Sequence, residues 1–317
     1  MKEEAEIFVG VDVSKDTLDV FDGVKSYRVQ AKPAKIRELV MRLKGAKLVV
    51  VESTGGYEMA LVKELWQAEV PVSIVNPRQV KRFAQGLAVE AKTDKIDAKI
   101  LQKFAVKNTP RETPRPSDEQ LRLSELIDRR RQLIESLIIE KNRAKAPAIS
   151  AQMNKDIKRA VSFLEKEVKR VTELAQEIIN STPELKAKAE VLSSEHGVGA
   201  VLTLSLLSDL PELGTINRNK IGALVGVAPY DNQSGSRDGR RHIRGGRKHI
   251  RAILYMATLA AIRRSPVLKP YFIAQVKRGK PKMSALIACM RKLLLILNSK
   301  MRAYYQQSSV AMPTLAC

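Results

Sequence analysis

Apolar runs in the first hundred residues are spaced as alternating strands and helices, and this spacing limits the fold more than any other feature. The strand-like segments are 6–13, 17–21, 25–30, 47–52 and 71–75. Helical spacing places apolar residues at Ile36, Leu39, Val40 and Leu43, and further helices are expected near 57–68, 77–86 and 94–107. Three hairpin-connected strands followed by αβαβα predict an α/β domain over residues 1–107.

Four acidic residues occupy informative places in this pattern. Asp12 interrupts the apolar run of the first strand, and Glu52 ends the apolar run of the fourth. Asp94 and Asp97 lie three residues apart and therefore share one face of the last helix. The element order is that of a ribonuclease H-like domain, in which the first and fourth strands are neighbours. A buried, unpaired carboxylate is unfavourable by roughly several kcal/mol, so we expect these four to converge and to bind a ligand.

Four convergent carboxylates can hold two divalent ions for in-line phosphoryl displacement. Hard oxygen ligands suit Mg²⁺, and Mn²⁺ is possible. Two other interpretations stay open. Asp94 and Asp97 could form a solvated face paired with neighbouring lysines, and Glu52 could help Ser53 and Thr54 to cap the next helix.

The charge balance predicts a polyanionic partner. The 317 residues include 56 Lys and Arg against 34 Asp and Glu, a formal net charge of +22. Nucleic acid is the expected partner, since the longest strongly apolar stretch, Leu293–Leu297, is far too short to span a bilayer. Only two cysteines are present, which supports neither a disulfide framework nor a zinc site. A cytoplasmic, nucleoid-associated protein without a membrane partner is therefore expected.

Beyond the first domain, the sequence predicts a linker and two helical regions. Residues 108–117 carry three prolines in seven positions and form the linker. Residues 118–182 carry apolar stripes with a break near Pro147, which favours two antiparallel helices in a coiled-coil hairpin over a plain helical bundle. Ser117 and Gln120 form a capping-box pattern at the start of this region.

Residues 183–317 are expected to form a mainly α-helical domain. It contains Gly197-Val198-Gly199, which either lets a phosphate approach the backbone or makes an ordinary helix-capping turn.

A basic, glycine-rich segment follows within this last domain, at residues 226–251. We expect it to be flexible and to lie along a phosphate backbone, although a solvated basic loop is the alternative. Its seven cations oppose a single acid, Asp238, in the stretch that they span: Arg237, Arg240, Arg241, Arg244, Arg247, Lys248 and Arg251. Ser234 lies just before them. Chemistry alone gives this serine little weight as a nucleophile, because most serines in such loops are turn residues.

Five blocks of sequence together resemble one family. They are Gly10–Lys15, Val51–Gly55, Lys92–Ala98, Gly197–Gly199 and Gly226–Gly235. In this order they closely resemble the DEDD-type insertion-sequence transposases, a family of bridge-RNA-guided serine recombinases related to pilin-gene invertases. The resemblance runs from about residue 6 to about residue 265.

The resemblance implies a RuvC-like N-terminal domain, a coiled-coil middle and a C-terminal transposase domain. It implies that Asp12, Glu52, Asp94 and Asp97 bind Mg²⁺ and that Ser234 attacks a DNA phosphate to give a phosphoserine intermediate, with Ser236 as the second choice. A non-coding guide RNA would pair with donor and target DNA. Members act as tetramers in which the acidic site of one subunit meets the serine of another, so we expect this chain to form a homo-oligomer, from dimer to tetramer.

Two further functions remain open at this point. One is a metal-dependent, structure-selective endonuclease without a covalent intermediate, which needs the carboxylates and not the serine. The other is a nucleic-acid-binding protein without enzymatic activity.

Overall fold

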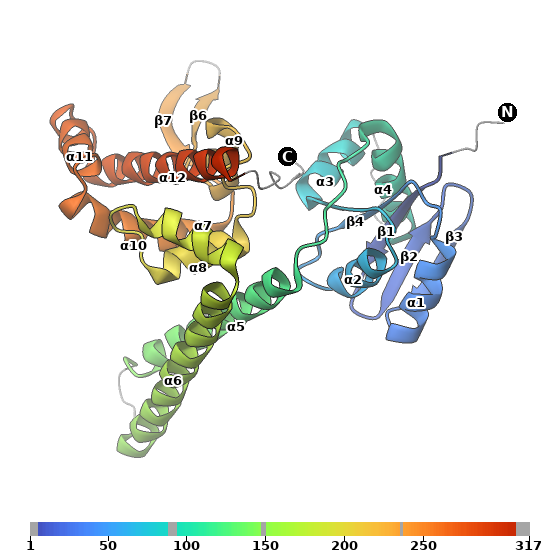
Figure 1. The fold of residues 1–317 in the computed structure, drawn as a ribbon, viewed down its shortest axis with the longest axis horizontal. Coiled ribbons are helices and arrows are strands. Elements are labelled where there is room, and N and C mark those ends of the chain that lie inside the picture. Colours follow the sequence, from blue (N-terminus) through green and yellow to red (C-terminus); the bar gives the residue numbers. More distant parts are fainter. Residues whose placement is uncertain (1–5, 88–93, 147–149, 235–236, 309–317) are drawn as a thin grey trace. The chain divides into compact units, whose positions relative to one another are not determined.

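The chain divides between Arg115 and Pro116 into two compact units. The computed structural model describes residues 6–87, 94–146, 150–234 and 237–308, with the backbone alone at 94–96 and 232–240 (Figure 1). Unit 1 carries the α/β part of the chain, and unit 2 carries the helical part with one small hairpin. No described helix is both long enough and apolar enough to cross a bilayer.

Unit 1 is built on a five-stranded mixed sheet in the order β3-β2-β1-β4-β5. The central strand β1 pairs antiparallel with β2 and parallel with β4. The strands are β1 (Phe8–Val13), β2 (Thr17–Phe21), β3 (Ser26–Gln30), β4 (Leu48–Glu52) and β5 (Val72–Val75). The helices are α1 (Pro33–Arg42), α2 (Met59–Gln67), α3 (Pro77–Gly86) and α4 (Asp94–Asn108). The predicted α/β class and the order of elements are confirmed.

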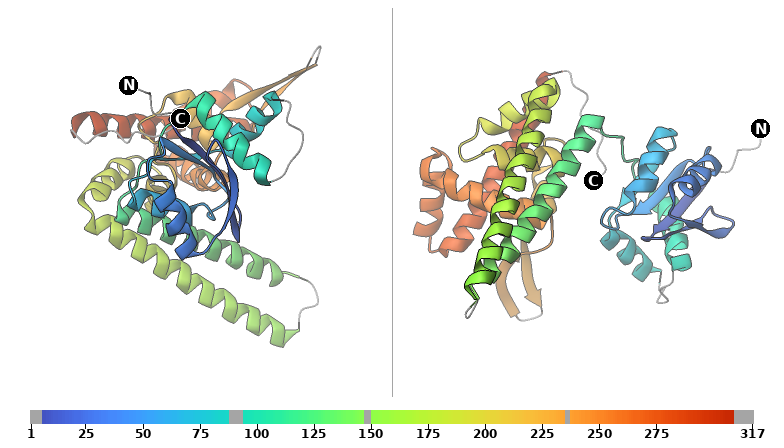
Figure 2. Two further views of the ribbon diagram at one scale, coloured as in Figure 1. Left: turned by 90° about the vertical axis from the view of Figure 1, so that its right-hand side faces the viewer. Right: turned by 90° about the horizontal axis from the view of Figure 1, so that it is seen from below.

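Alternation along the strands separates two apolar faces of the sheet. Phe8, Leu48 and Val50 share a core cluster with Leu101 and Phe104 of α4, so the even-numbered residues of β1 and β4 face this helix. The odd-numbered residues between them are buried against the opposite layer, where α1 and α2 lie (Figures 1 and 2). Both faces are therefore covered, which explains why β4 reads as a continuous apolar run.

The predicted linker is tied to the sheet edge before it leaves unit 1. Thr113 donates its backbone N–H to Val72 O at 2.7 Å, and its Oγ1 accepts the N–H of Ile74 at 3.0 Å. Its carbonyl accepts the indole N–H of Trp66 at 2.9 Å. Two of these bonds occupy the free side of the edge strand β5 and the third reaches α2, so the segment between α4 and Pro116 is partly held by unit 1.

Unit 2 begins with two long helices packed side by side, α5 (Asp118–Arg143) and α6 (Ala151–Ser181), as Figures 1 and 2 show. The predicted cap is confirmed, because Ser117 Oγ accepts the N–H of Gln120 at 3.1 Å. Ser150 caps α6 in the same way through Met153. Leu123 and Ile127 of α5 join Ala175 and Ile179 of α6 in the main apolar cluster of unit 2. Coiled-coil geometry in this pair stays a prediction.

Six more helices and a two-stranded sheet complete unit 2. The helices are α7 (Pro183–Ser193), α8 (Ala200–Asp209), α9 (Arg218–Val225), α10 (Lys248–Arg264), α11 (Leu268–Lys277) and α12 (Lys282–Gln307). The strands β6 (Pro229–Ser234) and β7 (Arg237–Ile243) pair antiparallel. Leu293, Leu294 and Leu297 of α12 are fully buried in the cluster that also takes in α8 and α10, so the apolar stretch seen in the sequence is a core helix.

Most of the basic segment is a β-hairpin of β6 and β7, so the expectation of a loop was wrong for these strands. Antiparallel pairing satisfies backbone groups that a loop would leave to water. Gly197 also has a structural role. It has a φ of +85°, and a Cβ there would lie 2.6 Å from Ala257 O of α10. Helix packing therefore accounts for this glycine, and the interpretation of Gly-x-Gly as a phosphate-binding turn is not needed.

Candidate active site

Asp12 and Glu52 are brought together by the pairing of β1 with β4. The register joins Val11 to Val51, so Asp12 and Glu52 come next on neighbouring parallel strands. Both side chains are half-buried. They lie on the even-numbered face of the sheet, which is the face that α4 covers.

Gly10 fixes where α4 lies on this face. A Cβ at Gly10 would be 2.2 Å from Ala98 O and 2.5 Å from Gln102 N, so the helix backbone approaches the strand as closely as only glycine permits. Phe8, on the far side of Gly10 from Asp12, shares its cluster with Phe104 and Ala105 from the second half of α4. The helix therefore runs antiparallel to β1, and its first turn, with Asp97, lies toward Asp12.

Three predicted carboxylates thus reach the same end of the same sheet face, namely Asp12, Glu52 and Asp97. Asp94 is the first residue of α4, one turn before Ala98, and its side chain lies outside the described residues. Among the side chains that the structure describes, no group of three or more His, Cys, Asp or Glu residues is arranged to hold a metal ion. Asp12, Glu52 and Asp97 each interact with other groups of the protein. The topology therefore brings Asp12, Glu52 and the first turn of α4 into one region of unit 1.

A further carboxylate, Asp19, extends this set and was missed in the sequence. Asp19 is 4% exposed and lies opposite Asp12 in the β1–β2 register. Arg28 lies opposite Asp19 on β3 and forms a bidentate ion pair with it, with Nη2–Oδ2 at 2.9 Å and Nε–Oδ1 at 3.0 Å. A row of one cation and three acids therefore crosses the sheet. The signal was available, because Asp19 interrupts the apolar residues of β2 as Asp12 does those of β1.

Glu58 is the acceptor for the loop that precedes α2, and its side chain makes no cap hydrogen bond to the helix itself. Its carboxylate accepts the N–H of Gly56 at 2.8 Å, the N–H of Thr54 at 3.2 Å and the hydroxyl of Thr54 at 3.0 Å. Glu58 is 5% exposed, so this cluster of bonds holds the loop that directly follows Glu52. Because α2 begins at Met59, these bonds hold the loop before the helix, and the capping alternative for Glu52 stays a prediction.

Ser234 is the last residue of β6 and pairs with Arg237, the first residue of β7. It therefore stands at the distal end of the hairpin, beside the two residues that join the strands. The structure describes the backbone of Ser234 and not its side chain, and Ser236 lies outside the described residues. The base of the hairpin is at the opposite end, where Pro229 pairs with Ile243.

Two of the predicted phosphate-binding cations hold the base of this hairpin. Arg247 binds both carboxylate oxygens of Glu212 at 2.6 Å. Arg251 donates to Gly245 O at 2.6 Å and to Gly226 O at 3.3 Å. The two glycines that flank the hairpin also touch, since a Cβ at Gly246 would lie 2.3 Å from Gly226 N. This end of the hairpin is therefore tied to α9 and to the loop that contains Glu212.

The other predicted cations differ in their surroundings. Arg241 is exposed and pairs with Asp231 at 2.6 Å, and Arg244 is exposed with its guanidinium 5.0 Å from the ring centroid of Tyr230. Lys248 is exposed at the start of α10. Arg237 and Arg240 are described by their backbone alone. Contact of these five with phosphates stays a prediction.

Comparison with known proteins gives matches to two family models. Residues 9–147 match the DEDD domain of the IS110 transposases, described as a transposase, and residues 189–272 match the model for the transposases of the IS116/IS110/IS902 family. Two stretches of the chain thus match the domain models of IS110-type transposases. A DEDD domain implies a RuvC-like fold, with which the mixed sheet of unit 1 agrees, and it suggests use of a divalent metal.

Two curated relatives are similar over most of the chain. They are the pilin gene-inverting proteins of Moraxella lacunata and Moraxella bovis, each 28% identical over 252 residues, which is 78% of this chain and 78% of the relative. The predicted resemblance to DEDD-type insertion-sequence transposases and to pilin-gene invertases is confirmed at this level. The predicted enzyme class, which acts on DNA by strand cleavage and rejoining, is confirmed as well.

Proposed function

We propose that this chain is an IS110-family transposase that exchanges DNA strands through a covalent link between Ser234 and a DNA phosphate. Asp12, Glu52, Asp94 and Asp97 are the proposed ligands of Mg²⁺, or of Mn²⁺ in its place. The observation that supports this most strongly is the placement of Asp12, Glu52 and the first turn of α4 at one end of one sheet face. All-oxygen ligand sets of this kind suit hard divalent cations.

In the proposed reaction, Ser234 Oγ attacks the phosphorus of a DNA strand. An Oγ–P bond forms, the bond from phosphorus to a sugar oxygen breaks, and that oxygen leaves as a hydroxyl with the proton that the serine gives up. Attack by the hydroxyl of another strand then reverses the step and releases the serine. When bound, divalent ions neutralise the phosphate and favour ionisation of the serine hydroxyl.

We infer site selection and assembly from the family resemblance and the composition. A non-coding RNA that pairs with donor and target DNA would choose the sites, and the protein would then need mostly backbone contacts. The formal charge of +22 and the exposed Arg241, Arg244 and Lys248 agree with such contacts. Dimers to tetramers would bring the acidic site of one subunit to the serine of another. The proposed functional divisions are residues 1–107, 118–182 and 183–317.

The test is a covalent protein–DNA adduct trapped on a labelled donor duplex with the matching RNA and Mg²⁺. Wild type and the neighbouring control Ser236→Ala should form the adduct. Ser234→Ala should form none and should lose strand exchange. Asp97→Asn should bind the nucleic acid and yield no adduct. If Ser234→Ala recombines DNA at the wild-type rate, the proposed nucleophile is wrong.

A structure-selective endonuclease is the second candidate, because the grouped carboxylates alone suffice for hydrolysis by an activated water. In this case Ser234→Ala retains cleavage, no adduct forms, and Asp97→Asn is inactive. The same variants therefore separate the two functions. If the wild-type protein with RNA and Mg²⁺ binds DNA but neither cleaves it nor forms an adduct, both candidates are contradicted and a nucleic-acid-binding protein remains.

A further inference from the structure

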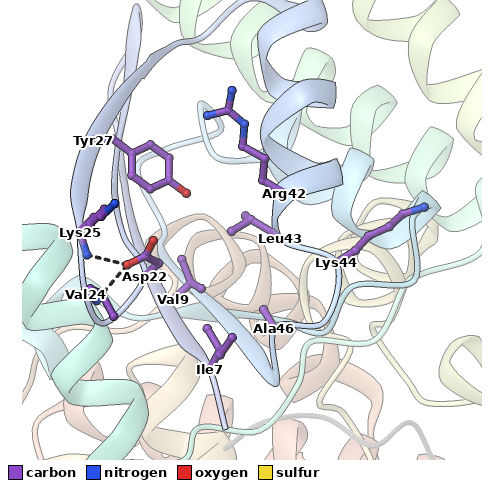
Figure 3. A pocket seen from close by; sticks show the side chains of 10 residues that line it. All are labelled: Ile7, Val9, Asp22, Val24, Lys25, Tyr27, Arg42, Leu43, Lys44 and Ala46. Carbon is purple, nitrogen blue, oxygen red and sulfur yellow. Dashed lines mark hydrogen bonds between the residues drawn. The ribbon is translucent and has the colours of Figure 1, made fainter. Parts of the chain in front are cut away.

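A pocket of about 490 Å³ opens on the side of the sheet opposite the candidate active site. Ile7 and Val9 line it from the start of the chain's first strand, and Tyr27 lines it from β3 (Figure 3). The odd-numbered Val9 points away from α4, whereas Phe8, Gly10 and Asp12 point toward it. Tyr27 pairs with Val20 and Val20 with Val11, which places the tyrosine on the same odd-numbered face. The pocket and the carboxylates are therefore separate sites of unit 1.

The floor of this pocket is apolar and its mouth carries exposed apolar side chains. Val9, Leu43 and Ala46 form buried parts of the lining, with exposed fractions of 1%, 4% and 8%. At the rim, Val24 is 84% exposed and Ile7 is 49% exposed. Pockets that bind small molecules are lined mainly by apolar side chains, and the lining of this pocket has the same character.

Cations surround the same opening. Lys25, Arg42 and Lys44 contribute three positive charges to the lining, and Asp22 contributes the one acid. Asp22 already holds the β2–β3 turn, because its Oδ1 accepts the N–H groups of Val24 at 2.9 Å and Lys25 at 2.7 Å. Figure 3 shows Tyr27 and Arg42 on two sides of the pocket, above Val9 and Leu43. The charge excess favours an anionic ligand.

Tyr27 supplies an aromatic ring and a hydroxyl donor at this opening. Burial, and next the negative charge of Asp22, raise the pKa of the Tyr27 phenol above its ordinary value. The phenol therefore stays neutral at physiological pH and keeps its proton for donation to a ligand. An aromatic ring, an apolar floor and nearby cations together match a ligand that has a flat ring and a phosphate.

We propose that this pocket binds one unpaired nucleotide of a single-stranded nucleic acid. The base would lie on the apolar floor beside Tyr27, and the phosphate would lie near Arg42 and Lys25. A volume of about 490 Å³ is in the range of small-molecule sites and accommodates one nucleotide. The inference rests on the proposed function only in that the protein handles nucleic acid. The site would hold a strand away from the carboxylates and would take no part in cleavage.

The test uses the full-length protein and a short single-stranded RNA that carries one photoreactive uracil. We expect the crosslink on the segment from Asp22 to Tyr27. The affinity for this RNA should fall on the order of tenfold in Tyr27→Leu and in Arg42→Gln, since stacking and one charged contact are lost. The matched control is Arg37→Gln, which removes the same charge from α1 at a residue that does not line the pocket and that lies 3.7 Å from Glu64.

Three results would overturn the proposal. They are crosslinks confined to unit 2, wild-type affinity in both pocket variants, and an equal loss of affinity for duplex DNA. Competition with a free mononucleotide tests whether the pocket binds a nucleotide of a strand or a free nucleotide. Displacement of the RNA by the mononucleotide at micromolar concentration would contradict a strand-binding site. Cleavage of DNA reports on the proposed function separately. Asp12→Asn should abolish cleavage and leave the crosslink, whereas failure of the crosslink with normal cleavage would contradict the pocket alone.

Discussion

Arg28 is the cation in the row of charged residues that crosses the sheet of unit 1. It binds Asp19, which is 4% exposed and lies opposite Asp12 in the strand register. Without this arginine, the buried carboxylate of Asp19 would keep its charge beside a second acid. The pair therefore belongs to the surroundings of the candidate active site, although neither residue is proposed to touch DNA.

We expect Arg28→Ala to destabilise the protein by about 1–2 kcal/mol, because it leaves a buried carboxylate unpaired. The loss is not larger because Arg28 itself is half exposed, and solvent screens the pair. Urea unfolding measures this change. The double variant Asp19→Asn with Arg28→Ala should recover part of the lost stability, since no buried charge remains. Equal stability of Arg28→Ala and wild type would show that the pair contributes nothing.

Glu58 offers a second test among single residues. Glu58→Ala removes the acceptor of two backbone N–H groups and of the hydroxyls of Ser53 and Thr54 in the loop after Glu52. We expect a loss of about 1–3 kcal/mol in unfolding free energy and a lower rate of DNA cleavage, because the loop no longer holds Glu52. The control is Glu38→Ala, which removes an exposed pair with Lys35 and should leave the stability nearly unchanged.

Residues whose role depends on local pattern could be predicted, and those with distant partners could not. Asp12 and Glu52 stand out because each charge sits against an apolar run. Glu58 has no such signal, because its partners are backbone groups of a loop whose course the sequence does not specify. Arg247 was counted among phosphate contacts, since nothing in its neighbourhood reveals that Glu212, 35 residues earlier, accepts both of its donors.

At the scale of elements, the contact between β1 and α4 decides the geometry of the candidate active site. Gly10→Ala should push α4 away from the sheet, because the new Cβ would lie 2.2 Å from Ala98 O. We expect a loss of about 1–3 kcal/mol in stability and loss of DNA cleavage, with the fold of unit 2 unchanged. Circular dichroism and the cleavage assay check this. Gly86→Ala is the matched control, since a Cβ there meets nothing within 4 Å.

The edge strand β5 provides another test at this scale. Thr113→Val keeps the size of the side chain and removes the oxygen that accepts the N–H of Ile74. We expect faster hydrogen exchange at Ile74 and a loss of about 1 kcal/mol, since a backbone donor of the edge strand loses its partner. The control is Thr215→Val, whose hydroxyl bonds only to Glu212 O within a turn of unit 2. Unchanged exchange at Ile74 would mean that water replaces the threonine.

Elements with a regular apolar pattern were predicted to within one or two residues, as for β2 and α3. The hairpin β6–β7 was missed because its residues are almost all polar and show no alternation that a buried face would impose. Its strands are paired through their backbones and tied at the base by Arg251, Gly226 and Gly246. These contacts join residues about 20 apart, which a scan of local pattern does not detect.

For the whole molecule, the net charge of +22 should make nucleic-acid binding depend strongly on salt. We expect the logarithm of the affinity for duplex DNA to fall linearly with the logarithm of the salt concentration. EDTA should abolish cleavage and leave this binding nearly unchanged, because phosphate contacts by Lys and Arg need no metal. Titration by fluorescence anisotropy with and without EDTA checks both statements. Binding that is insensitive to salt would contradict the charge argument.

The alternation of β1 has a genetic consequence. Substitutions at Val9 and at Gly10 alter opposite faces of one sheet, so they should impair different activities. A substitution at Val9 should weaken binding of single-stranded nucleic acid, and one at Gly10 should impair DNA cleavage. Deletion of the one codon between Gly10 and Asp12 would move every following side chain of β1 to the opposite face of the sheet. The aspartate would then enter the apolar layer beneath α1 and α2, and no compensating change at a neighbouring residue could restore it.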